Sequence, residues 1–309
     1  MKKIFIDGSS GTTGLRIFDR LTERKDIELI TLSDEQRKDP IARKKSINES
    51  DITFLCLPDD AAKESVSFLE NDKTVIIDTS TAHRTNSDWL YGFKEVINDF
   101  DSKIKTAKKI AVPGCHASGF IALVKPLIDN KIIDSKTLLT CTSITGYSGG
   151  GKKMIEEYEN ENSSILLKSP RQYALGQTHK HLKEMSIISG LDNPPAFMPI
   201  VAPFYSGMEV SVPLFKSQLL NGKSRQDIID LYKKIYNSNI VYYSEDNENG
   251  FISSNYLSTK DSMAIQVFGN DDRILLVARY DNLGKGASGA AIQCLNYVLN
   301  TFEETGLNL

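Results

Sequence analysis

FIDGSSGTTGLRIFDRL, at residues 5–21, carries the strongest indication of architecture in this chain. Gly8, Gly11 and Gly14 directly follow a short apolar run and open a segment with helical spacing. A turn without side chains lets backbone N–H groups and a helix N-terminus face a pyrophosphate, as in dinucleotide-binding βαβ units. The spacing is GxxGxxG rather than the commoner GxGxxG, so an ordinary glycine-rich turn is the alternative. Its place after the first strand favours a dinucleotide site.

The same strand–helix alternation continues to residue 113. Continuous apolar runs rich in β-branched residues are typical of strands covered on both faces of a parallel sheet. We therefore expect an α/β, Rossmann-like, doubly wound domain over residues 1–113. The expected strands are 3–6, 27–32, 52–57, 74–79 and 109–112, and helical spacing occurs at 14–24 and 60–70.

After Gly114 the pattern changes to long strand-prone runs without regular helices between them, and a hairpin-like turn occurs at 269–272. This predicts a second, α+β domain over residues 114–285 with a mixed or antiparallel sheet. The final segment, 286–309, is expected to complete the first domain with a helix. One face of that helix carries Ala290, Cys294, Tyr297 and Val298.

Composition excludes several classes of function. The 309 residues include 37 basic and 40 acidic side chains, with no dense basic patch, so nucleic acid is not an expected partner. The charged run 43–45 is interpreted as a solvated helix face. No apolar run approaches the roughly 18 residues of a membrane span, and residues 4–6 are too short for a secretory signal. We expect a cytoplasmic protein without membrane contact.

Four isolated cysteines provide neither a disulfide framework nor a zinc site, but one differs from the others. Cys115, in PGCHASGF at 113–120, precedes apolar residues at helical spacing and would begin a helix, where a thiolate is stabilised. Pro126 is expected to kink or end that helix. The other three, Cys56, Cys141 and Cys294, lie in apolar segments and are expected in the core.

A nucleophilic cysteine needs a proton partner, usually a histidine from a distant segment. His179 and His181 in YALGQTHKHLKEM are the candidates. His-x-His is also a metal-ligand spacing, but no third ligand accompanies it, so no metal is expected. His116 adjoins Cys115 but should point elsewhere in a helix. His83 is interpreted as a loop histidine near the cofactor.

The segment after the second expected strand, TLSDEQRK at 31–38, bears on the choice of cofactor. Hydroxyl and basic groups there suit a 2′-phosphate, whereas a carboxylate suits a ribose 2′-hydroxyl. Ser33, Arg37 and Lys38 favour NADP, and Asp34 argues for NAD. A dinucleotide, a thiolate and an imidazole together suit conversion between an aldehyde and an activated acyl group through a thioester.

At these residues the chain resembles the shorter form of the N-acetyl-gamma-glutamyl-phosphate reductase family, within the semialdehyde dehydrogenases. The resemblance implies NADPH-dependent reduction of N-acetyl-L-glutamyl 5-phosphate to the 5-semialdehyde in arginine biosynthesis, and a homo-oligomer, either dimer or tetramer. The motifs that carry it are GSSGTTG (8–14), LPDDAAKE (57–64), DTSTAHR (78–84), PGCHASGF (113–120), GYSGGGKKM (146–154), YALGQTHKHLKE (173–184), PFYSGM (203–208) and DNLGKGASGAAIQCLN (281–296).

The resemblance also implies roles for single residues. Cys115 aligns with the nucleophile and His179 with the acid/base, while Lys180 replaces the arginine usual between the two histidines of longer relatives. Residues aligned with the substrate are Arg84, Ser148, Gly149, Lys152, Tyr173, His181 and Glu184. Residues aligned with the cofactor are Gly8, Gly11, Thr12, Thr13, Gly14, Ser33, Arg37, Pro58, Ser80, Asn282 and Gly286.

Two alternatives remain at the level of sequence. The first is an aspartate-semialdehyde dehydrogenase-type enzyme, which shares the thiol and dinucleotide chemistry. The second is a noncatalytic protein that senses NAD(P) through the same glycine-rich loop, which leaves Cys115 unexplained.

Overall fold

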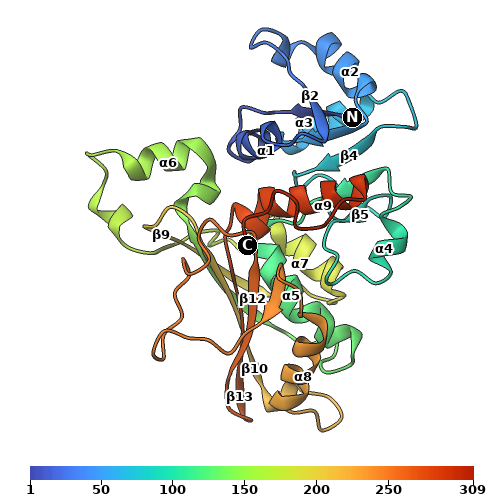
Figure 1. Cartoon of the computed structure of the whole chain (residues 1–309). Coiled ribbons are helices and arrows are strands. Elements are labelled where there is room, and N and C mark those ends of the chain that lie inside the picture. Colours follow the sequence, from blue (N-terminus) through green and yellow to red (C-terminus); the bar gives the residue numbers. More distant parts are fainter. The chain divides into compact units, whose positions relative to one another are not determined.

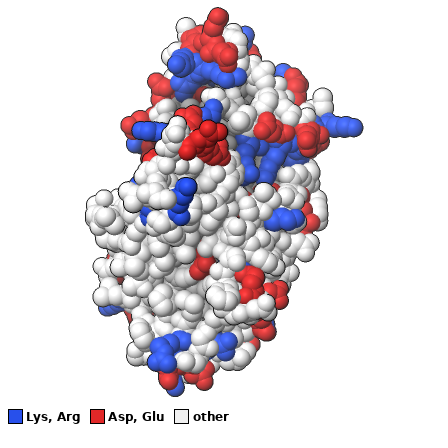
Figure 2. Space-filling model, turned by 90° about the vertical axis from the view of Figure 1, so that its left-hand side faces the viewer, with Lys and Arg blue, Asp and Glu red and all other residues white.

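The structure, a computed structural model, describes residues 1–309, and the chain divides into two compact units. Unit 1 comprises Met1–Gly114 and Ala287–Leu307, and unit 2 comprises Cys115–Gly286 with Asn308–Leu309. No helix combines the length and the apolarity that a bilayer crossing requires. Charged side chains on the face shown in Figure 2 form small groups of both signs beside a broad area without any.

Unit 1 contains a six-stranded, all-parallel sheet in the order β2-β1-β3-β4-β6-β5. Its strands β2, β4 and β5 are labelled in Figure 1. The five strands expected from the sequence are all present, and β5 is an addition. The chain order reverses at β1, so the carboxyl ends of β1 and β3 form the switch point where α/β sheets bind ligands. The elements are β1 (Lys2–Asp7), α1 (Thr12–Thr22), β2 (Ile27–Ile30), α2 (Pro40–Glu49), β3 (Ile52–Leu55), α3 (Asp59–Ser67), β4 (Val75–Asp78), β5 (Leu90–Tyr91), α4 (Phe100–Lys103), β6 (Lys109–Ala111) and α9 (Gly289–Leu299).

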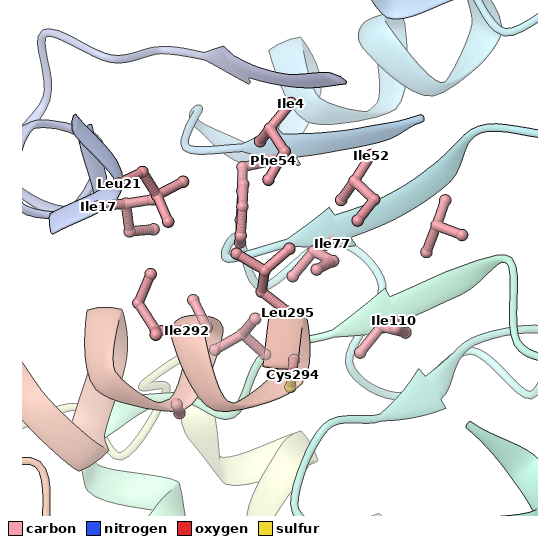
Figure 3. Packing of buried hydrophobic residues seen from close by; sticks show 14 of the residues in the cluster. Ile4, Ile17, Leu21, Ile52, Phe54, Ile77, Ile110, Ile292, Cys294 and Leu295 are labelled. Carbon is pink, nitrogen blue, oxygen red and sulfur yellow. The ribbon is translucent and has the colours of Figure 1, made fainter. Parts of the chain in front are cut away.

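Both faces of this sheet are buried, which explains the continuous apolar strands. On one face, Ile4 and Phe54 pack with Ile17 of α1 and with Ile292 and Leu295 of α9 (Figure 3). On the other face, a second cluster joins strand residues to α2 and α3. Its buried members are Phe5, Ile47, Leu55, Ala62, Ile76, Trp89 and Ala111.

The interpretation of 43–45 as a solvated face is wrong for Arg43. Its side chain is buried and forms ion pairs with Asp7 at 3.1 Å and with Glu64 at 2.9 Å. Asp7 is the last residue of β1 and is itself buried, so an opposite charge beside it offsets the desolvation of both groups. Arg43 therefore holds the strand end from which the glycine-rich loop leaves.

Unit 2 contains a seven-stranded mixed sheet in the order β11-β12-β13-β10-β7-β9-β8, as expected for an α+β domain. Three strands, β12, β13 and β10, are antiparallel neighbours (Figure 1), and β12 and β13 are joined by the predicted hairpin turn at 269–272. The strands are β7 (Thr140–Gly146), β8 (Arg171–Gln172), β9 (Ala196–Ala202), β10 (Met208–Phe215), β11 (Val241–Tyr243), β12 (Met263–Gly269) and β13 (Arg273–Tyr280). The helices are α5 (Cys115–Asp129), α6 (Gly151–Glu159), α7 (His181–Ser189) and α8 (Arg225–Ile235).

Helix α5 is almost wholly buried and begins at Cys115, as the spacing predicts. It continues through Pro126 to Asp129, so the proline does not end the helix. A proline lacks the N–H that would bond the carbonyl four residues earlier, here Ala122. The Tyr236 hydroxyl, directly after α8, donates to that carbonyl at 2.6 Å, and Tyr232 donates to the next one, of Leu123. The Tyr236 hydroxyl therefore replaces the donor that Pro126 lacks.

Candidate active site

The glycine-rich loop of unit 1 (residues 8–14) cannot carry side chains at two of its three glycines. Gly8 has φ +92°, and a Cβ there would lie 2.4 Å from the carbonyl oxygen of Cys56. A Cβ on Gly14 would lie 2.2 Å from the carbonyl oxygen of Gly8. Gly11 is different, because its Cβ would meet nothing closer than 3.6 Å. A bare loop that enters α1 at the switch point fits a dinucleotide pyrophosphate.

Most of the residues that the resemblance assigns to the cofactor lie at the carboxyl edge of the parallel sheet. Thr12 and Thr13 form the first turn of α1, and Pro58 caps α3. Ser33, Arg37 and Ser80 follow the ends of β2 and β4. Arg37, which favours NADP, forms an ion pair at 2.8 Å with Asp34, which favours NAD. Two further residues, Asn282 and Gly286, belong to unit 2.

Arg84, assigned to the substrate, is 7% exposed and belongs to unit 1. Its guanidinium donates to the carbonyl oxygens of Val112 at 2.9 Å and Thr79 at 2.8 Å, directly after β6 and β4. Close by in the sequence, His83 bonds the Asp78 carboxylate at 2.7 Å and stacks on Trp89. Arg84 is thus fixed to the ends of two strands rather than extended into solvent.

In unit 2, Cys115 is the first residue of α5 and is partly exposed. The Tyr280 hydroxyl donates to the Cys115 carbonyl at 2.6 Å and accepts from the Gly119 N–H at 3.0 Å, so it bridges the first turn of the helix. A Cβ on Gly286 would lie 3.2 Å from the Cβ of Cys115, so Gly286 brings bare backbone against the candidate nucleophile. Sequence reasoning missed Tyr280, for which no local signal exists.

The other cysteines are poor nucleophiles. Burial raises the pKa of Cys56 to about 12 and raises the pKa of Cys141, while Cys294 is buried in the core of unit 1. A thiol with a raised pKa carries little thiolate at neutral pH.

Three histidines and two aromatic residues from separate segments meet in unit 2; we call His116, Tyr173, His179, His181 and Phe197 the imidazole cluster. The ring centroids of His179 lie 5.6 Å from those of His116 and 4.8 Å from those of His181. His116 packs on Phe197 at 5.4 Å and bonds the Tyr173 hydroxyl at 2.7 Å. The structure therefore brings together three residues assigned by resemblance and adds His116, which sequence reasoning had set aside.

The imidazoles of His116 and His179 are held neutral. Burial and the charge of His179 lower the pKa of His116 to about 3, and burial and Lys180 lower the pKa of His179. Burial and the charge of Cys115 raise the pKa of Tyr173. No group of three or more His, Cys, Asp or Glu side chains is arranged to hold a metal ion.

His179 has a defined tautomer. Its Nδ1 accepts the backbone N–H of His181 at 3.1 Å, so the proton of the neutral ring is on Nε2. The ring is therefore a proton donor at Nε2. Its partner in the motif, His181, begins α7, and Glu184 is buried in the first turn of that helix.

A second group in unit 2 surrounds the loop between β7 and α6. Asn282 is buried and donates to Ser148 Oγ at 3.0 Å, while its Oδ1 accepts the Gly207 N–H at 2.9 Å. A Cβ on Gly149 would lie 3.3 Å from the Asn282 amide nitrogen. Lys152 is exposed in the first turn of α6. Asn282 therefore supports this loop, which presents Lys152 to solvent.

Comparison with known proteins is consistent with both units. Residues 3–104 match a family model described as semialdehyde dehydrogenase, NAD binding domain, and residues 115–282 one described as semialdehyde dehydrogenase, dimerisation domain. The chain is similar to N-acetyl-gamma-glutamyl-phosphate reductase 2 of Nostoc sp., with 42% identity over 99% of each chain. It is also similar to N-acetyl-gamma-glutamyl-phosphate reductase of Chelativorans sp., with 43% identity over 96% of this chain and 98% of that one.

Solved structures provide a more distant likeness. Aspartate semialdehyde dehydrogenase from Francisella tularensis has a TM-score of 0.72 and 16% identity, and covers 97% of this chain and 100% of its own. Aspartate semialdehyde dehydrogenase II complexed with ASA from Vibrio cholerae has a TM-score of 0.71 and 14% identity, and covers 98% of this chain and 99% of its own. At these identities the likeness concerns the fold alone.

Proposed function

The chain belongs to the N-acetyl-gamma-glutamyl-phosphate reductase family of semialdehyde dehydrogenases, and on that basis we propose that it reduces N-acetyl-L-glutamyl 5-phosphate. The products are N-acetyl-L-glutamate 5-semialdehyde and phosphate, with NADPH as reductant, in arginine biosynthesis. The observation that carries the proposal is Cys115, which begins buried helix α5 in the same unit as the imidazole cluster.

In the first step, the Cys115 thiolate attacks the acyl carbon of the substrate. The C–S bond forms, the bond from that carbon to the phosphate oxygen breaks, and phosphate leaves, so a thioester remains on Cys115. The helix N-terminus favours the thiolate, and the backbone N–H of Cys115 is a candidate donor to the developing oxyanion.

In the second step, the thioester is reduced to a thiohemiacetal, which collapses to the aldehyde. A nicotinamide nucleotide supplies the hydride for this reduction when bound. His179 Nε2–H donates a hydrogen bond to the oxyanion that hydride addition creates, and the oxyanion collapses to the aldehyde as the C–S bond breaks, which regenerates the Cys115 thiolate. A neutral imidazole with its proton on Nε2 suits this role.

The remaining assignments support binding. In unit 1 the cofactor is proposed to lie along Gly8, Gly11, Thr12, Thr13, Gly14, Pro58 and Ser80, and in unit 2 Asn282 and Gly286 are proposed contacts. For the substrate we propose Arg84, Ser148, Gly149, Lys152, Tyr173, His181 and Glu184. Lys152 is supported by its exposed ammonium group, which can pair with a phosphate.

A family model with an NAD binding domain indicates a nicotinamide cofactor, and we propose NADP specifically. Ser33 and Arg37 lie exposed after β2, the place where dinucleotide-binding folds bind the 2′-phosphate of NADP. The ion pair with Asp34 is exposed, so a phosphate can replace the carboxylate as the partner of Arg37. Arg37→Ala should weaken NADP binding and leave NAD binding unchanged, which a fluorescence titration with each reduced nucleotide would measure.

The proposal includes a cytoplasmic homo-oligomer, either dimer or tetramer. Residues 115–282 match a dimerisation domain, and several large apolar side chains of unit 2 are more than half exposed. They are Ile165, Leu166, Leu175, Phe215, Tyr256 and Phe251. Light scattering coupled to gel filtration would give the mass of the particle against the 34.4 kDa chain.

The test of the reaction is run in the reverse direction, with N-acetyl-glutamate semialdehyde, phosphate and NADP. Phosphate-dependent formation of NADPH supports the proposal. Aspartate semialdehyde is assayed beside it, and preference for that substrate would replace the proposal with the aspartate-type reaction. Tight NADP binding by folded protein with no turnover of either aldehyde would indicate a nucleotide-sensing protein instead.

A further inference from the structure

Asp281 lies directly after β13 in unit 2 and carries a fully buried carboxylate that no step of the proposed reaction uses. Its Oδ1 accepts the backbone N–H groups of Leu283 at 2.6 Å and Gly284 at 3.1 Å. Its Oδ2 accepts the Ser206 hydroxyl at 2.8 Å and the backbone N–H of Thr259. An ionised carboxylate has about four lone-pair sites, so these four donors use all of them.

The four donors come from three separate segments. Two lie in residues 281–286, which we call the Asp281 turn; Ser206 lies between β9 and β10, and Thr259 lies between β11 and β12. Thr259 has φ +70°, a left-handed backbone that β-branched residues rarely adopt. Such strain persists only where surrounding contacts fix the backbone, and the bond from the Thr259 N–H to Asp281 is one of those contacts.

The Asp281 turn contacts the candidate active site in two places. The Gly286 N–H donates to the Asp281 carbonyl at 3.0 Å, and a Cβ on Gly286 would lie 3.2 Å from the Cβ of Cys115. The Asn282 amide donates to Ser148 Oγ at 3.0 Å. The backbone of Gly286 therefore limits the space beside the Cys115 side chain, and Asn282 holds the loop that leads into α6.

We infer that Asp281 is a positioning residue for the proposed reaction, because its carboxylate fixes the turn that reaches both Cys115 and the loop at Ser148. It acts on the nucleophile through Gly286 and on the loop through Asn282. The inference rests on the proposed function for its catalytic meaning, whereas the hydrogen bonds that carry it are present in the resting protein.

The first test measures the rate at which iodoacetamide alkylates Cys115 in the full chain, with peptide mapping to distinguish the four cysteines. Asp281→Asn keeps the shape of the side chain, but its NH2 group cannot accept the two donors on its side. The released turn should let the reagent react with Cys115 about tenfold faster, the factor for losing roughly one hydrogen bond to a charged group. The fully buried Cys141 should stay unreactive.

Two outcomes of this measurement would overturn the inference. One is an unchanged alkylation rate of Cys115 in Asp281→Asn. The other is parallel alkylation of Cys141, which would show that the whole of unit 2 opens. If Asp281→Asn does not fold, Ser206→Ala takes its place, because it removes one donor and leaves the carboxylate. It should raise the rate about threefold, and no rise would equally overturn the inference.

Control variants show whether the effect belongs to this turn. Asp227 likewise accepts a backbone N–H and a hydroxyl, both from Ser224, at 2.9 Å and 2.7 Å, where they cap α8. Asp227→Asn should therefore change the alkylation rate of Cys115 by less than about twofold. Gly286→Ala places a methyl group beside Cys115 and should slow alkylation. Equal acceleration in Asp227→Asn and Asp281→Asn would reduce Asp281 to a structural role.

The same variants separate this inference from the proposed function. Turnover of N-acetyl-glutamate semialdehyde by wild type tests the function, whereas the alkylation rates need no substrate. If wild type turns over the semialdehyde, Asp281→Asn should lower kcat about tenfold and raise KM for phosphate about threefold, because both contacts of the turn are released. A lower melting temperature with kcat, KM and alkylation unchanged would show a merely structural role.

Discussion

The glycine-rich loop of unit 1 is built from seven consecutive residues, whereas the imidazole cluster of unit 2 is assembled from three separate segments, around His116, residues 173–181 and Phe197. The loop depends on the absence of side chains, since a Cβ at Gly8 or Gly14 would collide with backbone atoms. The cluster works through side chains whose tautomers and pKa values depend on their neighbours. We therefore expect substitutions in the loop of unit 1 to weaken nucleotide binding, and substitutions in the site of unit 2 to impair the chemical steps.

The largest effect is expected at Cys115. Cys115→Ser should reduce phosphate-dependent turnover by more than about four orders of magnitude, because no thioester can form. NADP should still bind, since the loop of unit 1 is untouched. Coupled measurement of turnover and nucleotide affinity checks both halves, and retained activity would refute the thioester mechanism.

A substitution in the loop of unit 1 should weaken NADP binding and leave the reactivity of Cys115 unchanged. Gly8→Ala forces a Cβ to within 2.4 Å of the Cys56 carbonyl at a positive φ, so NADP affinity should fall about 100-fold. Alkylation of Cys115 should be unchanged. Gly11→Ala is the matched control, because its Cβ has room, and should alter affinity within about threefold. Equal losses in the two variants would show that the close approach at Gly8 does not matter.

Acid should destabilise the fold through the cluster. The pKa of His116 is about 3 in the folded protein and 6.5 for a free side chain. Below pH 6.5, His116 therefore binds a proton in the unfolded chain but stays neutral in the folded protein. Stability is therefore lost as pH falls through 6.5 toward 3, by about 2 kcal/mol at pH 5. Urea unfolding of wild type and His116→Asn at pH 7 and pH 5 measures this, and identical pH dependence in both would contradict it.

The smallest effect is expected at Tyr280, which bridges the first turn of α5. Tyr280→Phe should lower kcat about tenfold and cost about 1 kcal/mol of stability, because Cys115 and Gly119 lose a shared partner. Tyr236→Phe removes a similar bond from the same helix near Pro126, and should cost similar stability while leaving kcat within about twofold. If both variants lose the same activity, the bridge at Cys115 has no special role.

Local features of the sequence predicted the parts of the molecule whose causes are local. The five strands and the loop of unit 1 depend on apolar runs and on glycines within a few positions of one another, so local sequence patterns predicted them. The start of α5 at Cys115 was also readable from the spacing of apolar residues. The mixed sheet of unit 2 was predicted from long strand-prone runs, whereas α6, α7 and α8, which lie between its strands, were not predicted.

The failures have distant causes. Arg43 looked solvated because its partner Asp7 is 36 residues away. Pro126 was expected to kink or end the helix; it does not end it, and Tyr236, which supplies the missing donor, comes from a distant segment. His116 was set aside because it cannot face Cys115, yet its hydrogen-bond partners Ser143 and Tyr173 lie 27 and 57 positions further on. A polar ring inside an otherwise apolar helix was the available signal, since a buried imidazole requires partners.

The position of α9 has a consequence for how the chain is made. Unit 1 begins at Met1 but takes Ile292 and Leu295 of its core from residues near the other end of the chain. During synthesis the first 114 residues emerge with one face of their sheet covered by α1 but not by α9, and all of Cys115–Gly286 follows before α9 appears. Most of unit 2 is therefore synthesised before unit 1 can complete its core with α9.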